Sequence, residues 1–463
     1  MTSKVTLGII GLLVMLAILS GRPQSLPYEA SGSISQTLCG KTFVARLDPD
    51  DVFQEHQLPE PGMWLIAWAI TYHVNRIEKL VSTDILGFFS RRSAFTTGRG
   101  CTLAYEGHSA PVPLSEREHT PALLPSIAER DEPVTGSADL AQAMLTAFTP
   151  PASDRTALTK AIVIVHNGRV IAERYTAGYS PSNALLSHSI AKSVVNALIG
   201  ILVRDGKLTL TDKAPVEAWR SPNDPRAAIT IDNLLRMNAG FGFDEGGGAS
   251  PATHMWFSEF DTAHFAAEAQ LESPIGRDWG YSSRSYAILS RIIADKVSGG
   301  PQGVKDFAQR ELFDPLGMHS VTLEFDAYGT MMGANAMFAT PRDWAKFGLL
   351  YLNKGKIGET QILPLGWVAY SARPTGRTGY GAGFWLNNTH TTIAHWGLRW
   401  GIPGAPADAF FSRGYLGQFV VVVPSQNLVI VRFGISRNPG SEAATIGRLV
   451  KDTISALKQS APN

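Results

Sequence analysis

The sequence is poor in cysteine and carries almost no net charge, and both shortages exclude classes of protein. Its 463 residues include two cysteines, Cys39 and Cys101, which are too few for a four-thiolate metal site but enough for one disulfide. Lysine and arginine number 41 against 40 aspartate and glutamate, so the net charge of +1 gives no overall field for nucleic acid or an acidic partner. The hydrophobic fraction of 44% supports a sizeable core and excludes disorder of the whole chain. The length suits about two or three domains, or one large domain with an insertion.

Long apolar runs are scarce too, which excludes a protein that crosses the membrane many times. One run approaches spanning length: residues 5–20 are uncharged and mostly apolar, and Lys4 precedes them. This run is slightly longer than the apolar part of a usual signal peptide and shorter than the roughly 20 residues that span a bilayer. No Ala-x-Ala cleavage site follows, and no cysteine is present there to carry a lipid. We expect an exported, periplasmic or otherwise extracytoplasmic protein in which residues 1–21 are either a cleaved signal peptide or a membrane anchor.

The next segment, residues 22–137, contains both cysteines. Oxidising compartments preserve disulfides, so export favours a bond between Cys39 and Cys101, although the spacing alone leaves the pairing open. Residues 22–37 are polar, with Ser, Gly and Pro, and predict a linker, while the Pro-, Glu-, Ser- and Thr-rich end of the segment predicts a connector. The apolar stretch at residues 63–70 is too short to span a bilayer and predicts core packing, with a second membrane contact as the alternative.

The β-prone runs lie at the two ends of a large domain expected at residues 138–463. Asn167-Gly168 separates two such runs and favours a hairpin, because both turn positions need positive φ. A second pair of runs flanks residues 424–427, and a helix with apolar residues at helical spacing closes the chain. Between these ends the pattern is mainly helical, with helices expected at residues 189–204, 286–297 and 341–353. We therefore expect a sheet formed from both ends of the domain, with a helical region inserted.

The most informative segment is residues 187–192, Ser-His-Ser-Ile-Ala-Lys, which leads into an apolar face at helical spacing. Ser189 would lie in the first turn of this helix, with Lys192 three residues later on the same side. The helix N-terminus favours negative charge on the serine oxygen, and a neighbouring amine can take the serine proton if desolvation or nearby positive charge lowers the lysine pKa. The alternative is a capping serine beside a solvated lysine, because Ser-x-x-Lys alone is a common pattern.

Two further motifs follow in a fixed order. Residues 280–283, Gly-Tyr-Ser-Ser, lead into a helix, and residues 412–418, Ser-Arg-Gly-Tyr-Leu-Gly-Gln, run into a strand. Residues 234–240, Leu-Leu-Arg-Met-Asn-Ala-Gly, and residues 339–348, Ala-Thr-Pro-Arg-Asp-Trp-Ala-Lys-Phe-Gly, link the motifs. In this order the segments resemble the serine β-lactamase and penicillin-binding-protein superfamily, in its class C, esterase and 6-aminohexanoate-dimer hydrolase branch.

The resemblance implies a fold, a site and a reaction. The fold would be α/β of the α+β type: a β-lactamase-like antiparallel sheet with flanking N- and C-terminal helices and a large inserted helical region. Ser189 would be the acylated nucleophile, Lys192 its base, and Tyr281 the relay of a proton to the leaving group and from the deacylating water. Backbone N–H groups of Ser189 and Tyr415, next to Gly414, would form the oxyanion hole. The substrate would be a small or peptide-like amide or ester, with no metal or other cofactor.

Two departures from the family pattern affect the expected activity. Ser283 stands where many members have asparagine, and its shorter side chain reaches less far toward Lys192 or a substrate amide. Ser412-Arg413-Gly414 replaces Lys-Thr-Gly, so the cation that would hold a β-lactam carboxylate is lost unless Arg413 takes its place. We therefore expect an amidase or esterase rather than an efficient β-lactamase. The alternatives are a catalytically silent protein that binds peptidoglycan-like or peptide ligands, and a penicillin-binding D,D-peptidase.

Other candidate residues carry less weight. His390 and His395 lack the carboxylate pattern that would support a metal site. Several tryptophans lie near the motifs and could line an apolar pocket, but core packing is the expectation for each of them: Trp279, Trp385, Trp396 and Trp400. The substrate and the oligomeric state are left open by the sequence, as is membrane attachment through residues 5–20.

Overall fold

The computed structural model describes residues 25–129, 132–245, 250–387, 392–393, 398–399 and 401–459. The apolar run at residues 5–20, expected to be a signal peptide or an anchor, lies outside these ranges, as do His390, His395, Trp396 and Trp400. In the part of the chain that is described, no helix combines the length and the apolar character needed to cross a membrane.

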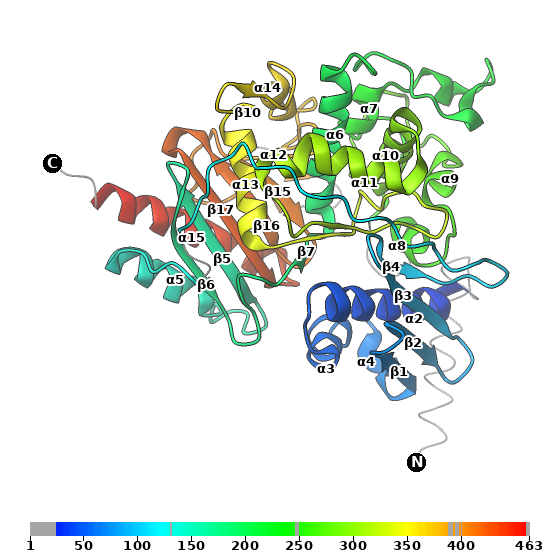
Figure 1. Cartoon of the computed structure of the whole chain (residues 1–463), viewed down its shortest axis with the longest axis horizontal. Helices are drawn as coiled ribbons and strands as arrows, with labels where there is room; N and C mark the ends of the chain where they lie inside the picture. Colours follow the sequence, from blue (N-terminus) through cyan, green and yellow to red (C-terminus); the bar gives the residue numbers. More distant parts are fainter. Residues whose placement is uncertain are drawn as a thin grey trace.

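A six-stranded antiparallel sheet forms the centre of the larger part of the molecule (Figure 1), in the order β12-β15-β16-β17-β5-β6. Five of its strands come from the two ends of the expected domain, as predicted, whereas β12 comes from the region between them that was expected to be mainly helical. The predicted Asn167-Gly168 turn joins β5 to β6, and both of its residues have positive φ, 50° and 78°. The strand bounds are β5 Leu158–His166, β6 Arg169–Tyr175, β12 Trp385–Leu386, β15 Phe410–Gly414, β16 Gln418–Val423 and β17 Leu428–Ile435.

Helices flank this sheet. The helix α5 (Ala138–Phe148) packs on β5 and β6, and the C-terminal helix α15 (Pro439–Gln459) packs against α5. The helix α13 (Pro341–Leu352) contacts β5, β16 and β17, and Figure 1 shows the sheet between α13 and the α5–α15 pair. The expected α+β architecture, with flanking helices and an antiparallel sheet, is therefore confirmed.

The inserted region is mainly helical, as predicted. The helix α6 (Ala191–Arg204) is buried along nearly its whole length and contacts α10 (Ser283–Val297). The helices α7, α9 and α11 contact α10. The bounds of the shorter elements are α7 Ile231–Leu235, α8 Pro251–Phe257, α9 Thr262–Ala267, α11 Gly300–Ala308, α12 Asp314–Leu316, α14 Trp367–Ser371, β7 Leu185–Leu186, β8 Thr322–Leu323, β9 Met337–Ala339, β10 Lys356–Ile357, β11 Thr360–Gln361, β13 Thr392–Ile393 and β14 Leu398–Arg399.

Residues 25–105 form a second body, which we call the N-terminal unit. A four-stranded antiparallel sheet in the order β1-β2-β3-β4 supports the helix α2 on one side. A disulfide joins Cys39 to Cys101, whose Cα atoms are 6.0 Å apart. The element bounds are α2 Ser25–Cys39, α3 Pro49–Val52, α4 Met63–Ile66, β1 Ile70–Asn75, β2 Leu80–Ile85, β3 Arg91–Thr96 and β4 Gly100–Leu103.

The helix α2 overturns the prediction of a linker at residues 22–37. Its small residues are there because the helix is closely packed: Ser31 and Ser35 are fully buried, and a Cβ added to Gly32 would lie 2.8 Å from the Phe257 carbonyl oxygen of α8. Ser35 also hydrogen-bonds to Ser93 of β3, with 2.9 Å between the hydroxyl oxygens. A composition rich in Ser and Gly is common to linkers and to tightly packed helices, so it does not distinguish them.

The prediction of core packing for residues 63–70 is also partly wrong. Met63 and Ala69 are buried, but Trp64 is 68% exposed and Trp68 is 62% exposed. The stretch forms the short helix α4, a turn and the beginning of β1, so it presents different residues to the interior and to solvent.

Buried polar contacts attach the N-terminal unit to the larger part. Glu324, which follows β8, accepts hydrogen bonds from the backbone N–H of Cys101 at 2.9 Å and from the Gln36 amide at 3.2 Å. Burial raises the pKa of this carboxyl to about 7. On the other side, the Asn183 amide donates to the Ala45 carbonyl at 2.7 Å. The extended chain after β4 then crosses the inserted helices (Figure 1) before α5 begins.

Candidate active site

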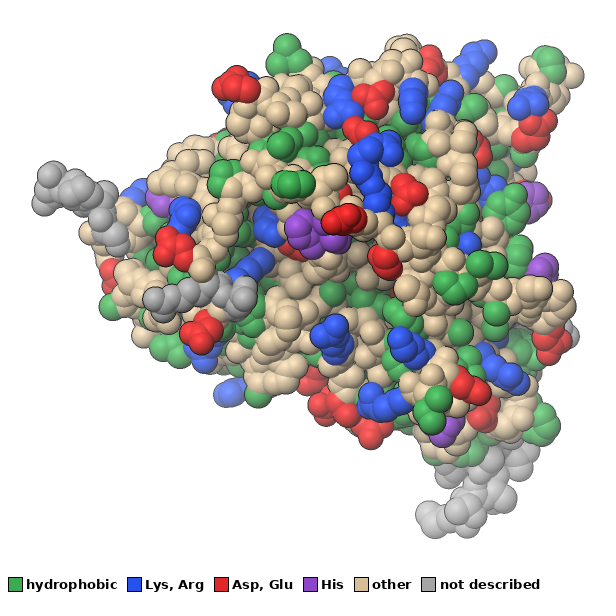
Figure 2. All heavy atoms as spheres, viewed as in Figure 1, with side chains coloured by type: hydrophobic (Ala, Val, Ile, Leu, Met, Phe, Trp, Pro, Cys, Tyr) green, Lys and Arg blue, Asp and Glu red, His purple; other side chains and the backbone are tan. Residues whose placement is uncertain are grey.

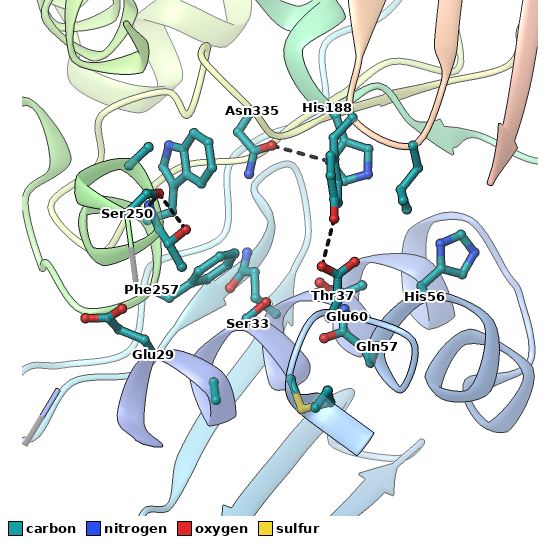
Figure 3. A pocket seen from close by; sticks show the side chains of 18 of the residues that line it. Glu29, Ser33, Thr37, His56, Gln57, Glu60, His188, Ser250, Phe257 and Asn335 are labelled. Carbon is teal, nitrogen blue, oxygen red and sulfur yellow. Dashed lines mark hydrogen bonds between the residues drawn. The ribbon is translucent and has the colours of Figure 1, made fainter. Parts of the chain in front are cut away.

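Two of the three expected catalytic residues, Ser189 and Tyr281, line a cavity of about 1100 Å³ between the N-terminal unit and the larger part. Figure 3 shows its lining side chains converging from both: Glu29, Ser33 and His56 from the N-terminal unit, and His188 and Asn335 from the larger part. Ser189, Glu245 and Tyr281 line the same cavity. Basic and acidic side chains are intermixed over the face of the molecule drawn in Figure 2, in agreement with the absence of a single-sign field predicted from composition.

Ser189 and Lys192 are in direct contact. Ser189 lies in a tight turn at residues 188–190 that continues into α6, and Lys192 is in the first turn of that helix. The Lys192 Nζ atom is 2.9 Å from the Ser189 Oγ atom. The predicted helix thus begins two residues later than expected, and the Ser-x-x-Lys spacing still places both side chains on one side.

Lys192 is almost fully buried, at 1% exposure. Its ammonium also donates to the Ala334 carbonyl at 2.8 Å and to the Glu245 carboxylate at 3.1 Å. Burial lowers the pKa of Lys192 below its ordinary value, while the negative charge of Glu245 opposes that shift. The result excludes the solvated lysine considered from the sequence, because this amine is desolvated and held next to the serine.

Tyr281 completes the group. The Lys192 Nζ atom lies over its ring at 4.9 Å from the centroid. Burial raises the pKa of Tyr281 well above its ordinary value, the charge of Glu245 raises it further, and a hydrogen bond with Ser189 opposes them. Trp385 stacks on Tyr281 with 5.3 Å between ring centroids, and Trp279 packs against both rings. These tryptophans therefore support the tyrosine from the core.

Glu245 is the site residue that the sequence analysis missed. Its Oε1 atom accepts hydrogen bonds from both Lys192 and the Ser283 hydroxyl, so the carboxylate bridges the lysine and the third position of the tyrosine motif. Its neighbour Asp244 caps α10: one carboxylate oxygen accepts from the Ser283 N–H at 2.9 Å, the other from the Ser282 hydroxyl at 2.9 Å. Burial and the adjacent Glu245 charge raise the pKa of Asp244 to about 6. In the sequence, the two adjacent acidic residues at 244–245 were the feature that could have indicated Glu245 as a site residue.

The end of β15 lies against the serine turn. A Cβ added to Gly414 would lie 2.2 Å from the Ser187 carbonyl oxygen, so only glycine fits there without displacing backbone. The next residue, Tyr415, begins the hairpin loop to β16, and its ring meets the His188 ring edge-on at 5.7 Å. This places the Tyr415 backbone next to the turn that holds Ser189. The Tyr415 side chain points instead to the N-terminal unit, where its hydroxyl donates to Glu60 at 2.7 Å.

Arg413 forms an ion pair rather than offering an unbalanced charge to the cavity. Its guanidinium donates to both carboxylate oxygens of Glu442 on α15, one of them at 2.7 Å from Nη2. The arginine is 14% exposed in its side chain and the glutamate 2%. A bidentate pair of this kind fixes the side chain and balances its charge. This pairing argues against the idea that Arg413 takes the place of the missing lysine of the third motif.

One group of metal-ligating side chains occurs in the described ranges, away from the cavity. His119, Asp314 and His319 bring one potential ligand atom each within 4.8 Å of one another. The Asp314 carboxylate already accepts from the His119 ring at 2.7 Å and from the backbone and hydroxyl of Thr120. These hydrogen bonds give the cluster a structural role, because they hold the extended connector against α12.

Comparisons with known proteins agree with the geometry. The family model described as Beta-lactamase matches residues 146–453. The chain is 23% identical over 226 residues to the 6-aminohexanoate-dimer hydrolase of Paenarthrobacter ureafaciens, a match that covers 45% of this chain and 56% of that protein. A protein of Alkalihalophilus pseudofirmus without an assigned function is 21% identical over 308 residues, which cover 58% of this chain and 82% of that one.

Solved structures show the same fold. A Bacillus anthracis protein described as a 6-aminohexanoate-dimer hydrolase superposes with a TM-score of 0.55 at 21% identity, and the match covers 74% of this chain and 89% of that one. A penicillin-binding protein homologue from Caulobacter crescentus gives a TM-score of 0.53 at 15% identity, covering 70% of this chain and 98% of that one. The family model covers about two thirds of the sequence, and the chain therefore belongs to the beta-lactamase family.

Proposed function

We propose that this chain is an exported serine hydrolase that cleaves an amide or ester bond through an acyl-enzyme on Ser189. The observation that carries the proposal is the 2.9 Å contact between the Ser189 hydroxyl and the buried Lys192 amine. Nucleophile and base within hydrogen-bonding distance, with the base oriented by a third group, is the arrangement that activates a serine. Here the third groups are the Ala334 carbonyl and Glu245, which fix the amine from two sides.

The proposed reaction has two steps. The Ser189 oxygen bonds to the substrate carbonyl carbon, the serine proton passes to Lys192, and Tyr281 donates a proton to the leaving oxygen or nitrogen as its bond to carbon breaks. Tyr281 suits a donor because its raised pKa keeps the phenol protonated. Water then attacks the acyl carbon and gives a proton to the deprotonated Tyr281, the bond to Ser189 breaks, and the serine oxygen recovers its proton from Lys192. Backbone N–H groups of Ser189 and Tyr415 stabilise the negative oxygen in both steps.

The substrate is an amide or ester rather than a β-lactam. A β-lactam carboxylate needs a cation at the third motif, and Arg413 is already paired with Glu442. The relative from Paenarthrobacter ureafaciens, which is a 6-aminohexanoate-dimer hydrolase by name, favours an amide or a related acyl compound. Export is supported by the apolar run at residues 5–20 and by the disulfide, since such bonds persist in oxidising compartments.

The test is intact-mass spectrometry of the full-length protein after exposure to a fluorophosphonate and, separately, to a penicillin. We expect one fluorophosphonate adduct, mapping to Ser189, and no stable penicillin adduct. A stable penicillin adduct on Ser189 would favour a D,D-peptidase. Absence of any adduct on folded protein would overturn the hydrolase and favour a silent protein that binds peptide-like ligands.

A further inference from the structure

The N-terminal unit contributes a wall of the cavity. The family model begins at residue 146, so this unit precedes the part of the chain that it matches. The cavity nevertheless includes side chains from α2, α4 and the end of β2 together with Ser189 and Tyr281. The shape of the space in front of the nucleophile is therefore set in large part by residues outside the family match.

This wall is mainly apolar. Its apolar side chains are Leu26, Ala30, Met63, Leu65, Ile66, Ile85, Leu86 and Phe89 from the N-terminal unit and Ala252, Trp256 and Phe257 from α8. Polar side chains of α2 and α8 line the cavity beside them: Glu29, Ser33, Gln36, Thr37 and Thr253. A small acyl group would leave most of these side chains in contact with water inside the cavity. At about 1100 Å³ the space is slightly larger than the roughly 300–1,000 Å³ that ligand pockets usually enclose. Its size and lining suit a long aliphatic chain.

The opposite end of the cavity is polar. Lys41 contacts the His56 ring, with 2.8 Å between Nζ and Nδ1, and Glu60 accepts from Tyr415 beside His188. Figure 3 shows His56 and Phe257 on opposite sides of the cavity, with Ser33 and Glu60 between them. A ligand that fills the whole space therefore meets the ionisable groups Lys41, His56 and Glu60 at one end. At the other end it meets a mainly apolar lining that also includes Glu29 and Ser250, and this combination suits an amphiphile.

The apolar end reaches the surface next to exposed hydrophobic side chains. Leu86 lines the cavity and is also 45% exposed, so the cavity opens beside it. Phe88, two residues later, is 80% exposed, and Trp64 on the outer side of α4 is 68% exposed. Tryptophan at such positions is typical of surfaces that contact the boundary between lipid and water.

We propose that the substrate is an amphiphilic ester or amide with a long aliphatic chain, and that this chain lies in the cavity between α2, α4 and α8. The proposal rests on the hydrolase proposed above and names its substrate class. Hydrolysis proceeds at Ser189 as already written, with the chain carried by either the acyl group or the leaving group. Burial of the chain then provides binding energy that a short substrate lacks.

The first test compares 4-nitrophenyl esters from acetyl to dodecanoyl, and alkyl esters of one short acid, using the full-length protein. We expect kcat/KM to rise by about fourfold per methylene in at least one series until the chain fills the cavity. Labelling of Ser189 by a small fluorophosphonate with flat profiles in both series would overturn the long-chain substrate and leave the hydrolase standing. Absence of labelling would overturn the hydrolase itself.

A variant that fills the cavity provides the second test. Ala30→Phe places a ring among the apolar lining of α2, and we expect it to lower kcat/KM for the dodecanoyl ester by about tenfold or more while the acetyl ester changes little. Ala138→Phe, at the exposed start of α5, is the matched control and should preserve the profile. A thermal melt establishes that each variant is folded. Equal losses on both esters in folded Ala30→Phe would overturn the placement of the chain.

A third experiment tests whether the amphiphile is taken from solution or from a bilayer. The same long-chain ester is offered as dissolved monomer and within phosphatidylcholine vesicles, to the wild type and to a Trp64→Ser/Trp68→Ser variant. A loss confined to vesicles would support a substrate taken from a bilayer, and equal activity of the two proteins in both forms would support a dissolved amphiphile. If the wild type hydrolyses neither the dissolved nor the vesicle-bound ester while Ser189 is still labelled, the proposed substrate class is overturned.

Discussion

The two bodies of the molecule differ in how they use polar and apolar residues. Around Ser189, the larger part holds a buried lysine whose Nζ atom has three polar contacts, to a hydroxyl, a carbonyl and a carboxylate. The N-terminal unit instead leaves Trp64, Trp68 and Phe88 exposed while a disulfide and a tightly packed helix hold its interior. In the function proposed above, the larger part therefore contributes the reacting groups, and the N-terminal unit contributes to the shape of the pocket.

The largest effect on kcat should come from removing the proposed nucleophile in the larger part. Ser189→Ala removes the oxygen that would be acylated, and we expect kcat to fall by about 10⁴-fold or more, because the remaining groups cannot form the intermediate. Hydrolysis of a 4-nitrophenyl ester measures it. Ser455→Ala, on the exposed side of α15, is the control. A Ser189→Ala variant with undiminished turnover would place the reaction elsewhere.

Lys192→Arg should lower kcat slightly less than Ser189→Ala does. Arginine keeps the positive charge but does not deprotonate, so we expect a loss of about 10³-fold, within the usual contribution of a general base. In the wild type, the lowered pKa of Lys192 predicts that kcat/KM rises with pH and levels off below the ordinary lysine value of 10.5. A pH–rate profile measures both effects, and an unchanged profile in the arginine variant would remove Lys192 from the base role.

Lys192 also predicts how stability depends on pH. Between its lowered pKa in the folded protein and 10.5, the unfolded chain binds more protons, so the free energy of unfolding should rise with pH across that window. Lys192→Met removes this dependence. Denaturant unfolding at several pH values compares the variant with the wild type, and parallel curves for the two proteins would contradict a desolvated lysine.

Breaking the N-terminal unit should affect stability and pocket shape before chemistry. The disulfide closes a loop of 62 residues, and Cys39→Ser/Cys101→Ser should lower the free energy of unfolding by about 4 kcal/mol from loop entropy alone. We expect turnover of long-chain esters to fall more than that of acetyl esters, because α2 forms one wall of the cavity. Denaturant unfolding and the two ester assays measure this, and equal losses on both esters would argue against a separate pocket wall.

A smaller effect is expected at Glu245, which connects the lysine to the tyrosine motif. Its negative charge raises the pKa of Lys192, so Glu245→Gln should lower that pKa and move the acidic limb of the pH–rate profile down by about one pH unit. Glu359→Gln, a fully exposed glutamate after β10, should leave the limb in place. A limb that stays fixed in Glu245→Gln would mean that the two charges are not coupled.

The smallest effect should follow from loosening one contact between the two bodies. Tyr415→Phe removes the hydrogen bond to Glu60, and we expect the free energy of unfolding to fall by about 1 kcal/mol. Tyr328→Phe, on another exposed tyrosine, is the comparison. Denaturant unfolding of both variants measures the difference, and equal values would show that this contact adds nothing to the attachment.

The larger part was predictable because its signals are local. The Asn167-Gly168 turn, the β-prone runs and helical periodicity predicted the sheet and the helices. The grouping of Ser189 and Lys192 with Tyr281 was implied by the resemblance to the β-lactamase superfamily. Helices expected at 286–297 and 341–353 correspond to Ser283–Val297 and Pro341–Leu352. Glu245 was missed because it lies in a loop, where no periodicity relates a carboxylate to a lysine 53 residues earlier.

The N-terminal unit was less predictable, for physical reasons as well. The small residues of α2 serve close packing against α8, yet the same composition is typical of flexible segments. Residues 63–70 are apolar throughout, and only the structure distinguishes those that face the cavity from those that face solvent. A pocket wall contributed by a separate unit leaves no spacing pattern that a single sequence could display.

The approach of Gly414 to the serine turn bears on which parts of the third motif can change over evolutionary time. With the Ser187 carbonyl 2.2 Å from the position a Cβ would take, any side chain at residue 414 displaces the backbone that carries the nucleophile. Neighbouring positions have no such restriction, since Ser412 and Arg413 are held by side-chain partners that can be exchanged together with them. Substitution at Gly414 should therefore be less tolerated than substitution at Ser412 or Arg413 made together with a change of the side-chain partner, so that this end of the strand can change its polar residues and still leave the serine turn in place.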